Sequence, residues 1–191
     1  MARRESRMLE LGTPAPSFAL PDPAGHVHRL EDFGEAPALL VAFICNHCPY
    51  VKHIIDGFAG FAREYGQKGL AVVAISPNDA EAYPADAPPA MAEVAAAHGF
   101  TFPYLHDASQ SVALAYQAIC TPDFFLFDRD RRLAYRGQFD DSRPNSGIPV
   151  TGASLRAAAD AVLQGRPVPG EQVPSVGCSI KWKAENAPDW A

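Results

Sequence analysis

The chain has 191 residues, a formal net charge of −6 at pH 7 and a hydrophobic content of 48%. This length supports one well-buried core and is short for two ordinary domains. The acidic balance argues against a nucleic-acid partner, because Arg3, Arg4 and Arg7 are too few to form a basic surface. A membrane partner is not expected either, because no stretch approaches the roughly 18 uninterrupted apolar residues of a membrane span.

The first twenty residues carry charges and prolines where a secretory signal has an apolar centre. We therefore expect a cytoplasmic protein. In a reducing compartment, thiols are more often catalytic, metal-binding or simply buried than cross-linked. The spacing of the four cysteines must then indicate what they do.

The N-terminal half predicts an α/β arrangement. Residues 16–20 and 26–30 flank a turn rich in proline, which predicts a β-hairpin. The apolar run 38–44 predicts a central strand covered on both faces. From Cys48 to about Tyr65 apolar residues recur at spacings of three and four, which predicts a helix, and a second buried strand follows at 70–75.

The second half continues this pattern. The predicted helices cover 91–98, 111–119 and 153–163, and the predicted strands cover 100–105, 123–128 and 133–136. Beyond Gly165 the chain is rich in Pro and Gly, which favours an irregular tail. We expect a single domain over residues 1–191, with a core at about 12–165 and a tail at 166–191.

A Cys-x-x-Cys motif lies where the first buried strand becomes a helix. At that junction the first sulfur would meet the unpaired N–H groups and the dipole of the helix N-terminus, which stabilise a thiolate. Cys45 is therefore the predicted nucleophile and Cys48 the predicted resolving thiol. Between them lie Asn46 and His47, and a cationic imidazole there would favour the thiolate and make the disulfide a better oxidant.

Residues 45–51, with the sequence Cys-Asn-His-Cys-Pro-Tyr-Val, and residues 121–125, 136–141 and 177–183 resemble the thioredoxin-like superfamily. Within it they are similar to the cytosolic peroxiredoxin-like redoxins of the AhpC/TSA group. The resemblance implies a thioredoxin-like α/β fold, a central mixed sheet flanked by helices, here with an N-terminal β-hairpin and an irregular C-terminal tail. It also implies a cis bond between Thr121 and Pro122, whose backbone would bind an extended substrate segment as an added strand.

The predicted activity is thiol–disulfide exchange with a disulfide-containing protein or a small-molecule thiol, and a cellular thiol reductant is the second expected partner. No cofactor and no metal are expected, and an oligomer is possible. A thiol peroxidase is the alternative enzyme, although Cys45 stands where true peroxiredoxins have Thr or Ser three residues before the peroxidatic cysteine. A metal site built from Cys45, His47, Cys48 and His53 is the alternative from a different class.

The other two cysteines and one charged cluster carry weaker predictions. Cys120 is interpreted as a buried small hydrophobic residue. Cys178 could fold back from the tail as an extra resolving thiol, although a single cysteine in a reducing compartment usually has no such role. Asp140, Asp141 and Arg143 are interpreted as a solvated surface cluster.

Overall fold

A computed structural model of the protein describes residues 3–190. Its central sheet has five strands in the order β6-β5-β4-β8-β9. These strands are β4 (Ala38–Phe43), β5 (Leu70–Ser76), β6 (Tyr104–His106), β8 (Asp123–Phe127) and β9 (Leu133–Gly137). β4, β5 and β6 run parallel, whereas β8 pairs antiparallel with both β4 and β9. The sheet is therefore mixed, as predicted, and the parallel strands β4 and β5 are joined by a helical crossover.

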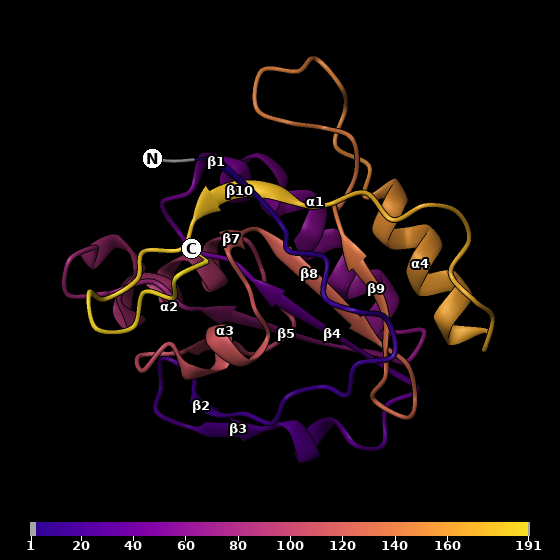
Figure 1. Cartoon of the computed structure of the whole chain (residues 1–191), viewed down its shortest axis with the longest axis horizontal. Coiled ribbons are helices and arrows are strands. Elements are labelled where there is room, and N and C mark those ends of the chain that lie inside the picture. The colour runs from indigo at the N-terminus through magenta and orange to yellow at the C-terminus, as the bar shows by residue number, and fades with distance from the viewer. Residues whose placement is uncertain (1–2, 191) are drawn as a thin grey trace.

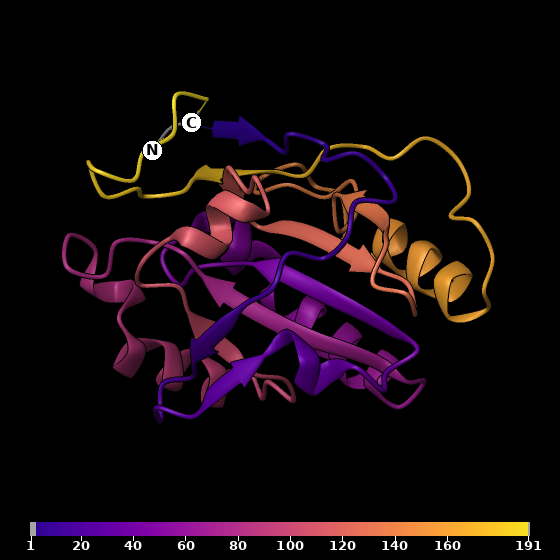
Figure 2. The same cartoon turned by 60° about the horizontal axis from the view of Figure 1, so that its bottom comes forward.

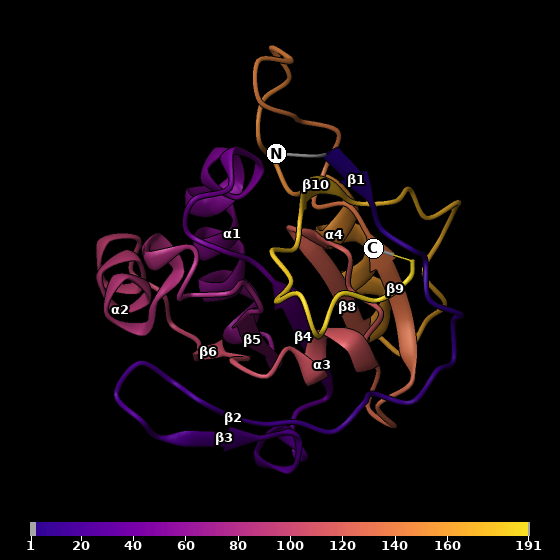
Figure 3. The ribbon, with the colours of Figure 1, turned by 60° about the vertical axis from the view of Figure 1, so that its left-hand side comes forward.

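Helices cover both faces of this sheet (Figure 3). One face packs against α1 (Pro49–Gly66), α2 (Pro88–Ala97) and α4 (Ala153–Leu163). The other face packs against α3 (Ser111–Ala115) and the hairpin formed by β2 (Ala19–Pro21) and β3 (Val27–Arg29). The described residues also form two short 3-10 helices, η1 (Leu30–Phe33) and η2 (Pro84–Asp86). Among the described residues, no helix combines the length and the apolar character needed to cross a membrane.

Most predicted elements are confirmed, and several are shorter than predicted, among them both strands of the N-terminal hairpin. The helix expected at 111–119 ends at Ala115, because Gln117 takes a left-handed backbone conformation, with φ of 51°, that a helix cannot continue through. The strand expected at 100–105 begins only at Tyr104. Before it, the rings of Phe100 and Phe102 stack at 4.5 Å and pack against the core.

The C-terminal tail is not irregular throughout. It contains β10 (Val176–Ser179), the middle strand of a second sheet between β1 (Arg3–Glu5) and β7 (Cys120–Thr121). Figures 1 and 2 show β1 and β10 side by side, although they come from opposite ends of the chain. The tail therefore belongs to the folded body and returns to the segment that precedes β8.

Candidate active site

The Cys-x-x-Cys motif occupies the turn between β4 and α1. Cys45 lies just beyond β4, and Cys48 is the N-cap residue of α1, followed by Pro49 at the first helical position. Both cysteines are free, and their exposed fractions are 1% and 0%. The prediction that the helix N-terminus acts on Cys45 is wrong, because the helix begins at Pro49. The backbone N–H of Val51, in the first turn of the helix, instead helps to lower the pKa of Cys48.

Thr121 contacts both active-site sulfurs. The Sγ atom of Cys45 lies 3.2 Å from the Thr121 hydroxyl oxygen, and the Sγ atom of Cys48 donates to the Thr121 carbonyl at 3.1 Å. The peptide bond between Thr121 and Pro122 is cis, as predicted. Residues more than 70 positions apart in the chain are thus brought together at one buried site.

The two active-site thiols ionise very differently. A hydrogen bond from the Cys45 thiol lowers the pKa of Cys48 to about 5, and the Cys178 thiol and two backbone N–H groups add to the shift against the effect of burial. The same hydrogen bond, together with burial and the Asp86 carboxylate, raises the pKa of Cys45 well above its usual range. The Thr121 carbonyl opposes ionisation of Cys48, because only the protonated thiol can donate to it. The hydrogen bond from the Cys45 thiol is the largest influence on Cys48, so ionisation is favoured at Cys48 over Cys45.

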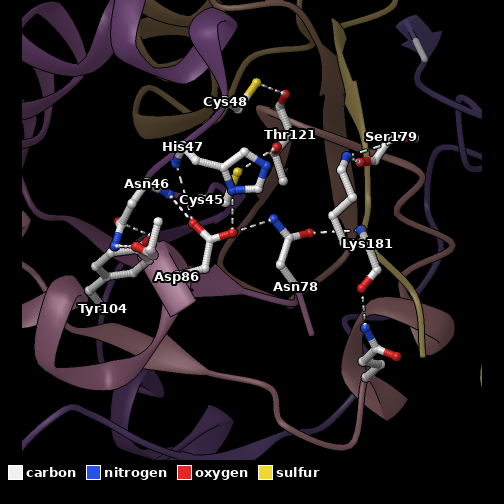
Figure 4. A network of polar contacts seen from close by, with 12 residues as sticks. Cys45, Asn46, His47, Cys48, Asn78, Asp86, Tyr104, Thr121, Ser179 and Lys181 are labelled. Atoms are coloured by element: carbon white, nitrogen blue, oxygen red, sulfur yellow. Dashed lines mark hydrogen bonds and ion pairs between the residues drawn. The ribbon is translucent and has the colours of Figure 1, made fainter. Parts of the chain in front are cut away.

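Asp86 organises the polar side of the site (Figure 4). Its carboxylate is fully buried and accepts hydrogen bonds from the backbone N–H groups of Asn46 and His47 at 2.7 and 3.3 Å. The Asn78 amide donates to it at 2.8 Å, and Nδ1 of His47 lies 2.6 Å from it. A buried carboxylate with this many donors is well satisfied. Asp86 therefore holds the backbone of the Cys-x-x-Cys turn in place.

Asn46 and His47 act differently from their predicted roles. The Asn46 side chain accepts a hydrogen bond from the Tyr104 hydroxyl at 3.0 Å, so it fixes the turn. The His47 ring pairs with Asp86 and stacks on Tyr83, with ring centroids 5.4 Å apart. The groups that shift the pKa of Cys45 do not include His47; hydrogen bonding to the second cysteine, burial and the adjacent Asp86 carboxylate raise that pKa.

The predicted substrate-binding position at Thr121 is already filled. β10 pairs antiparallel with β7, which places Cys178 opposite Thr121. Thr121 is only 1% exposed, and the Ser175 hydroxyl donates to the Pro122 carbonyl at 2.6 Å. The expectation that Thr121 and Pro122 offer a free edge to a substrate strand is therefore wrong for this conformation, because the protein's own tail occupies that edge.

One set of possible metal ligands forms among the described residues. Ligand atoms of Cys45, His47 and Asp86 all lie within 4.8 Å of one another. His53, a member of the predicted alternative set, lies elsewhere and contacts the Ser142 hydroxyl at 3.1 Å. The oxygens of Asp86 already accept hydrogen bonds from the turn and from Asn78, so the cluster is accounted for by these contacts without a metal ion.

Cys120 is buried, as predicted, and burial raises its pKa. The neighbouring Asp123 is fully buried, and burial raises its pKa to about 8.

The interpretation of Asp140 as a solvated residue is wrong, because Asp140 is 3% exposed and accepts hydrogen bonds from the N–H groups of Thr151 and Gly152 at the start of α4. Asp140 thus stabilises the N-terminus of that helix.

Sequence reasoning missed three residues of the polar network. Asp86, Asn78 and Lys181 come from three separate segments, and the Lys181 backbone N–H donates to the Asn78 side-chain oxygen at 2.8 Å. Asp86 lies in a proline-rich stretch that predicts only a loop. No local pattern distinguishes it, because its role depends on partners about 40 residues away.

Comparison with known proteins places the chain in a family. The model of the AhpC/TSA family matches residues 11–136. The thiol-disulfide oxidoreductase ResA of Geobacillus kaustophilus (strain HTA426) is 25% identical over 126 residues, which are 66% of this chain and 68% of that protein.

Two crystal structures are much more similar. A hypothetical protein from Sinorhizobium meliloti 1021 is 57% identical, with a TM-score of 0.93 over 94% of this chain and 98% of that one. An uncharacterized conserved protein from Geobacillus kaustophilus is also 57% identical, with a TM-score of 0.94 over 96% of this chain and 98% of that one. With its mixed sheet, its cysteine pair at the start of α1 and the family match over residues 11–136, this chain belongs to the AhpC/TSA family and is a thioredoxin-fold redoxin.

Proposed function

We propose that this protein is a thiol–disulfide oxidoreductase whose redox pair is Cys45 and Cys48. The observation that carries the proposal is the placement of two free, buried thiols at the start of α1, both in contact with Thr121. A hydrogen bond from Cys45 favours a thiolate on Cys48. A thiolate beside a second thiol is what thiol–disulfide exchange requires. The name of the relative from Geobacillus kaustophilus agrees with this function.

In the proposed reaction the Cys48 thiolate attacks one sulfur of a substrate disulfide. The first substrate thiolate leaves and takes up a proton, and a mixed disulfide joins Cys48 to the other substrate sulfur. Cys45 then loses its proton and attacks the Cys48 sulfur, which releases the second substrate thiol. The substrate disulfide gains two electrons and the cysteine pair loses two. This order reverses the roles predicted from the sequence, where Cys45 attacks first.

The proposed substrate is a disulfide-containing protein or a small-molecule disulfide, and a cellular thiol reductant in the cytoplasm would regenerate the reduced pair. Because Cys48 is 0% exposed, a protein substrate reaches its sulfur only after β10 moves away from β7. A small disulfide needs a smaller opening. The rate of disulfide exchange should therefore be much higher with a small disulfide than with a protein disulfide.

The midpoint potential of the pair, measured against glutathione from pH 4 to pH 8, tests this proposal. We expect one two-electron transition whose potential falls as the pH rises. Below the Cys48 pKa of about 5 the reduced pair holds two protons, and above it one. The slope should therefore change near that pH from about 59 to about 30 mV per pH unit. A chain that forms no Cys45–Cys48 disulfide at any potential would rule out the proposed function.

Thiol peroxidase activity is the second candidate, and burial of Cys48 is the observation that favours it. A small oxidant such as hydrogen peroxide enters a closed site more easily than a protein does. The Cys48 thiolate would take one oxygen to become a sulfenic acid, and Cys45 would condense with it to form the disulfide and water. Stopped-flow peroxide consumption, with dimedone trapping in Cys45→Ser, tests this. Peroxide use much slower than disulfide exchange would exclude it.

A further inference from the structure

The backbone of β10 approaches Thr121 closely at Gly177. A Cβ atom on Gly177 would lie 2.0 Å from the Thr121 carbonyl oxygen and 3.0 Å from the Pro122 nitrogen, so no larger residue fits without moving main-chain atoms. Cys178 pairs with Thr121, and Ser179 pairs with Cys120. The tail thus pairs with Thr121, the residue that contacts the sulfurs of Cys45 and Cys48.

The rest of the tail is held in register from both sides. β1 pairs with the outer edge of β10, with Arg3 opposite Cys178. Beyond the strand, the Ile180 N–H donates to the Ile119 carbonyl at 3.0 Å. The Lys181 N–H donates to Asn78, which in turn donates to Asp86 (Figure 4). A tail fixed by so many backbone contacts holds Cys178 in a defined position.

That position places a third thiol beside the redox pair. Cys178 lies opposite Thr121 in the β10–β7 pair, and the Cys48 thiol donates to the Thr121 carbonyl at 3.1 Å, so both thiols meet at one residue. Burial and a hydrogen bond with Cys48 raise the pKa of Cys178 to about 12. Cys178 is 4% exposed and shares one core cluster with Cys45 and Cys48. When Cys48 is part of a disulfide it carries no charge, so its effect on the Cys178 pKa disappears and Cys178 ionises more easily.

We propose that Cys178 is a third redox-active residue, which replaces Cys45 as the disulfide partner of Cys48 and so ties β10 to the active site. This inference rests on the proposed function, because a Cys45–Cys48 disulfide must form first. Cys178 then attacks the Cys48 sulfur, the Cys45–Cys48 bond breaks and a Cys48–Cys178 bond forms. The proton of Cys178 ends on Cys45, and no electrons enter or leave. The two oxidised forms differ in whether the tail is free to open.

Disulfide mapping tests the inference. The purified full-length chain is oxidised with diamide, quenched in acid, blocked with N-ethylmaleimide and analysed by peptide mass spectrometry. We expect both Cys45–Cys48 and Cys48–Cys178 linkages in the wild type. Cys45→Ser should give Cys48–Cys178 as its main intramolecular linkage. The matched control Cys120→Ala removes another buried thiol and should leave the wild-type pattern unchanged.

The possible results separate the two proposals. Cys48–Cys178 missing from both the wild type and Cys45→Ser, with Cys48 instead joined to a second chain, would overturn the role of Cys178. The oxidoreductase would survive that result if the wild type still forms Cys45–Cys48. No disulfide at Cys48 in the wild type would refute the proposed function itself. The wild-type map needs no substitution, so a poorly folded variant does not affect this decision.

Discussion

Replacing Cys48 with serine is expected to slow reduction of a protein disulfide by roughly 10³-fold or more, the scale of losing a catalytic nucleophile. The reason is that Cys48 carries the thiolate, with a pKa lowered to about 5, whereas the pKa of Cys45 is raised. Cys45→Ser should instead keep the first attack and fail in the second. It should accumulate a mixed disulfide between Cys48 and the substrate when Cys178 is also replaced by alanine, because Cys178 can otherwise attack the Cys48 sulfur and release the substrate.

Insulin reduction measures the rate of each variant, and mass spectrometry identifies the cysteine that holds the substrate. Cys120→Ala is the matched control, because it removes a buried thiol outside the pair, and it should react at close to the wild-type rate. If Cys48→Ser traps the substrate on Cys45 instead, the order predicted from the sequence is the right one. Full activity in both serine variants would contradict any role of the pair.

Gly177→Ala is expected to release the tail and make the active-site sulfurs more reactive. The added methyl group would lie 2.0 Å from a main-chain oxygen of Thr121, and a backbone atom in a sheet cannot easily move aside. Overpacking of this kind costs about 1–3 kcal/mol. We expect this cost to destabilise the closed state, in which β10 is paired with β7. Because 1.4 kcal/mol corresponds to a factor of ten, the reduced protein should then react with Ellman's reagent roughly 5- to 150-fold faster.

The matched control is Gly60→Ala. Gly60 lies within α1, and a Cβ there meets nothing within 4 Å, so this variant should keep the wild-type rate. Hydrogen exchange at Val176–Ser179 should rise in Gly177→Ala and stay unchanged in the control. Equal thiol reactivity in the two variants would mean that β10 does not limit access to the sulfurs.

The sequence predicted well the helices and strands that a pattern of nearby residues specifies. The apolar runs of β4 and β5 and the three-and-four spacing along α1 reflect burial against one sheet, and burial leaves a periodic trace in the residues themselves. The Cys-x-x-Cys motif was read directly from the sequence, and the cis bond at Pro122 followed from the resemblance to a family. These features depend on neighbours within a few positions.

The distribution of charge between the two thiols depended on the tertiary structure. Whether Cys45 or Cys48 meets the helix N-terminus depends on a shift of a few residues in where α1 begins. The Asp86 carboxylate, which raises the pKa of Cys45, comes from a loop about 40 residues further along the chain. Such contacts leave no periodic pattern in the sequence, because each joins only two residues that lie far apart along the chain.

An α/β core with a paired-cysteine motif at a strand-to-helix junction follows from the amino-acid sequence alone. The closure of the tail over that motif is a property of the folded chain. β10 has four residues, and its partner strands lie near residues 3 and 120. Backbone pairing between such distant short strands depends little on side-chain pattern, so the position of Cys178 beside Cys48 emerges only when the chain folds.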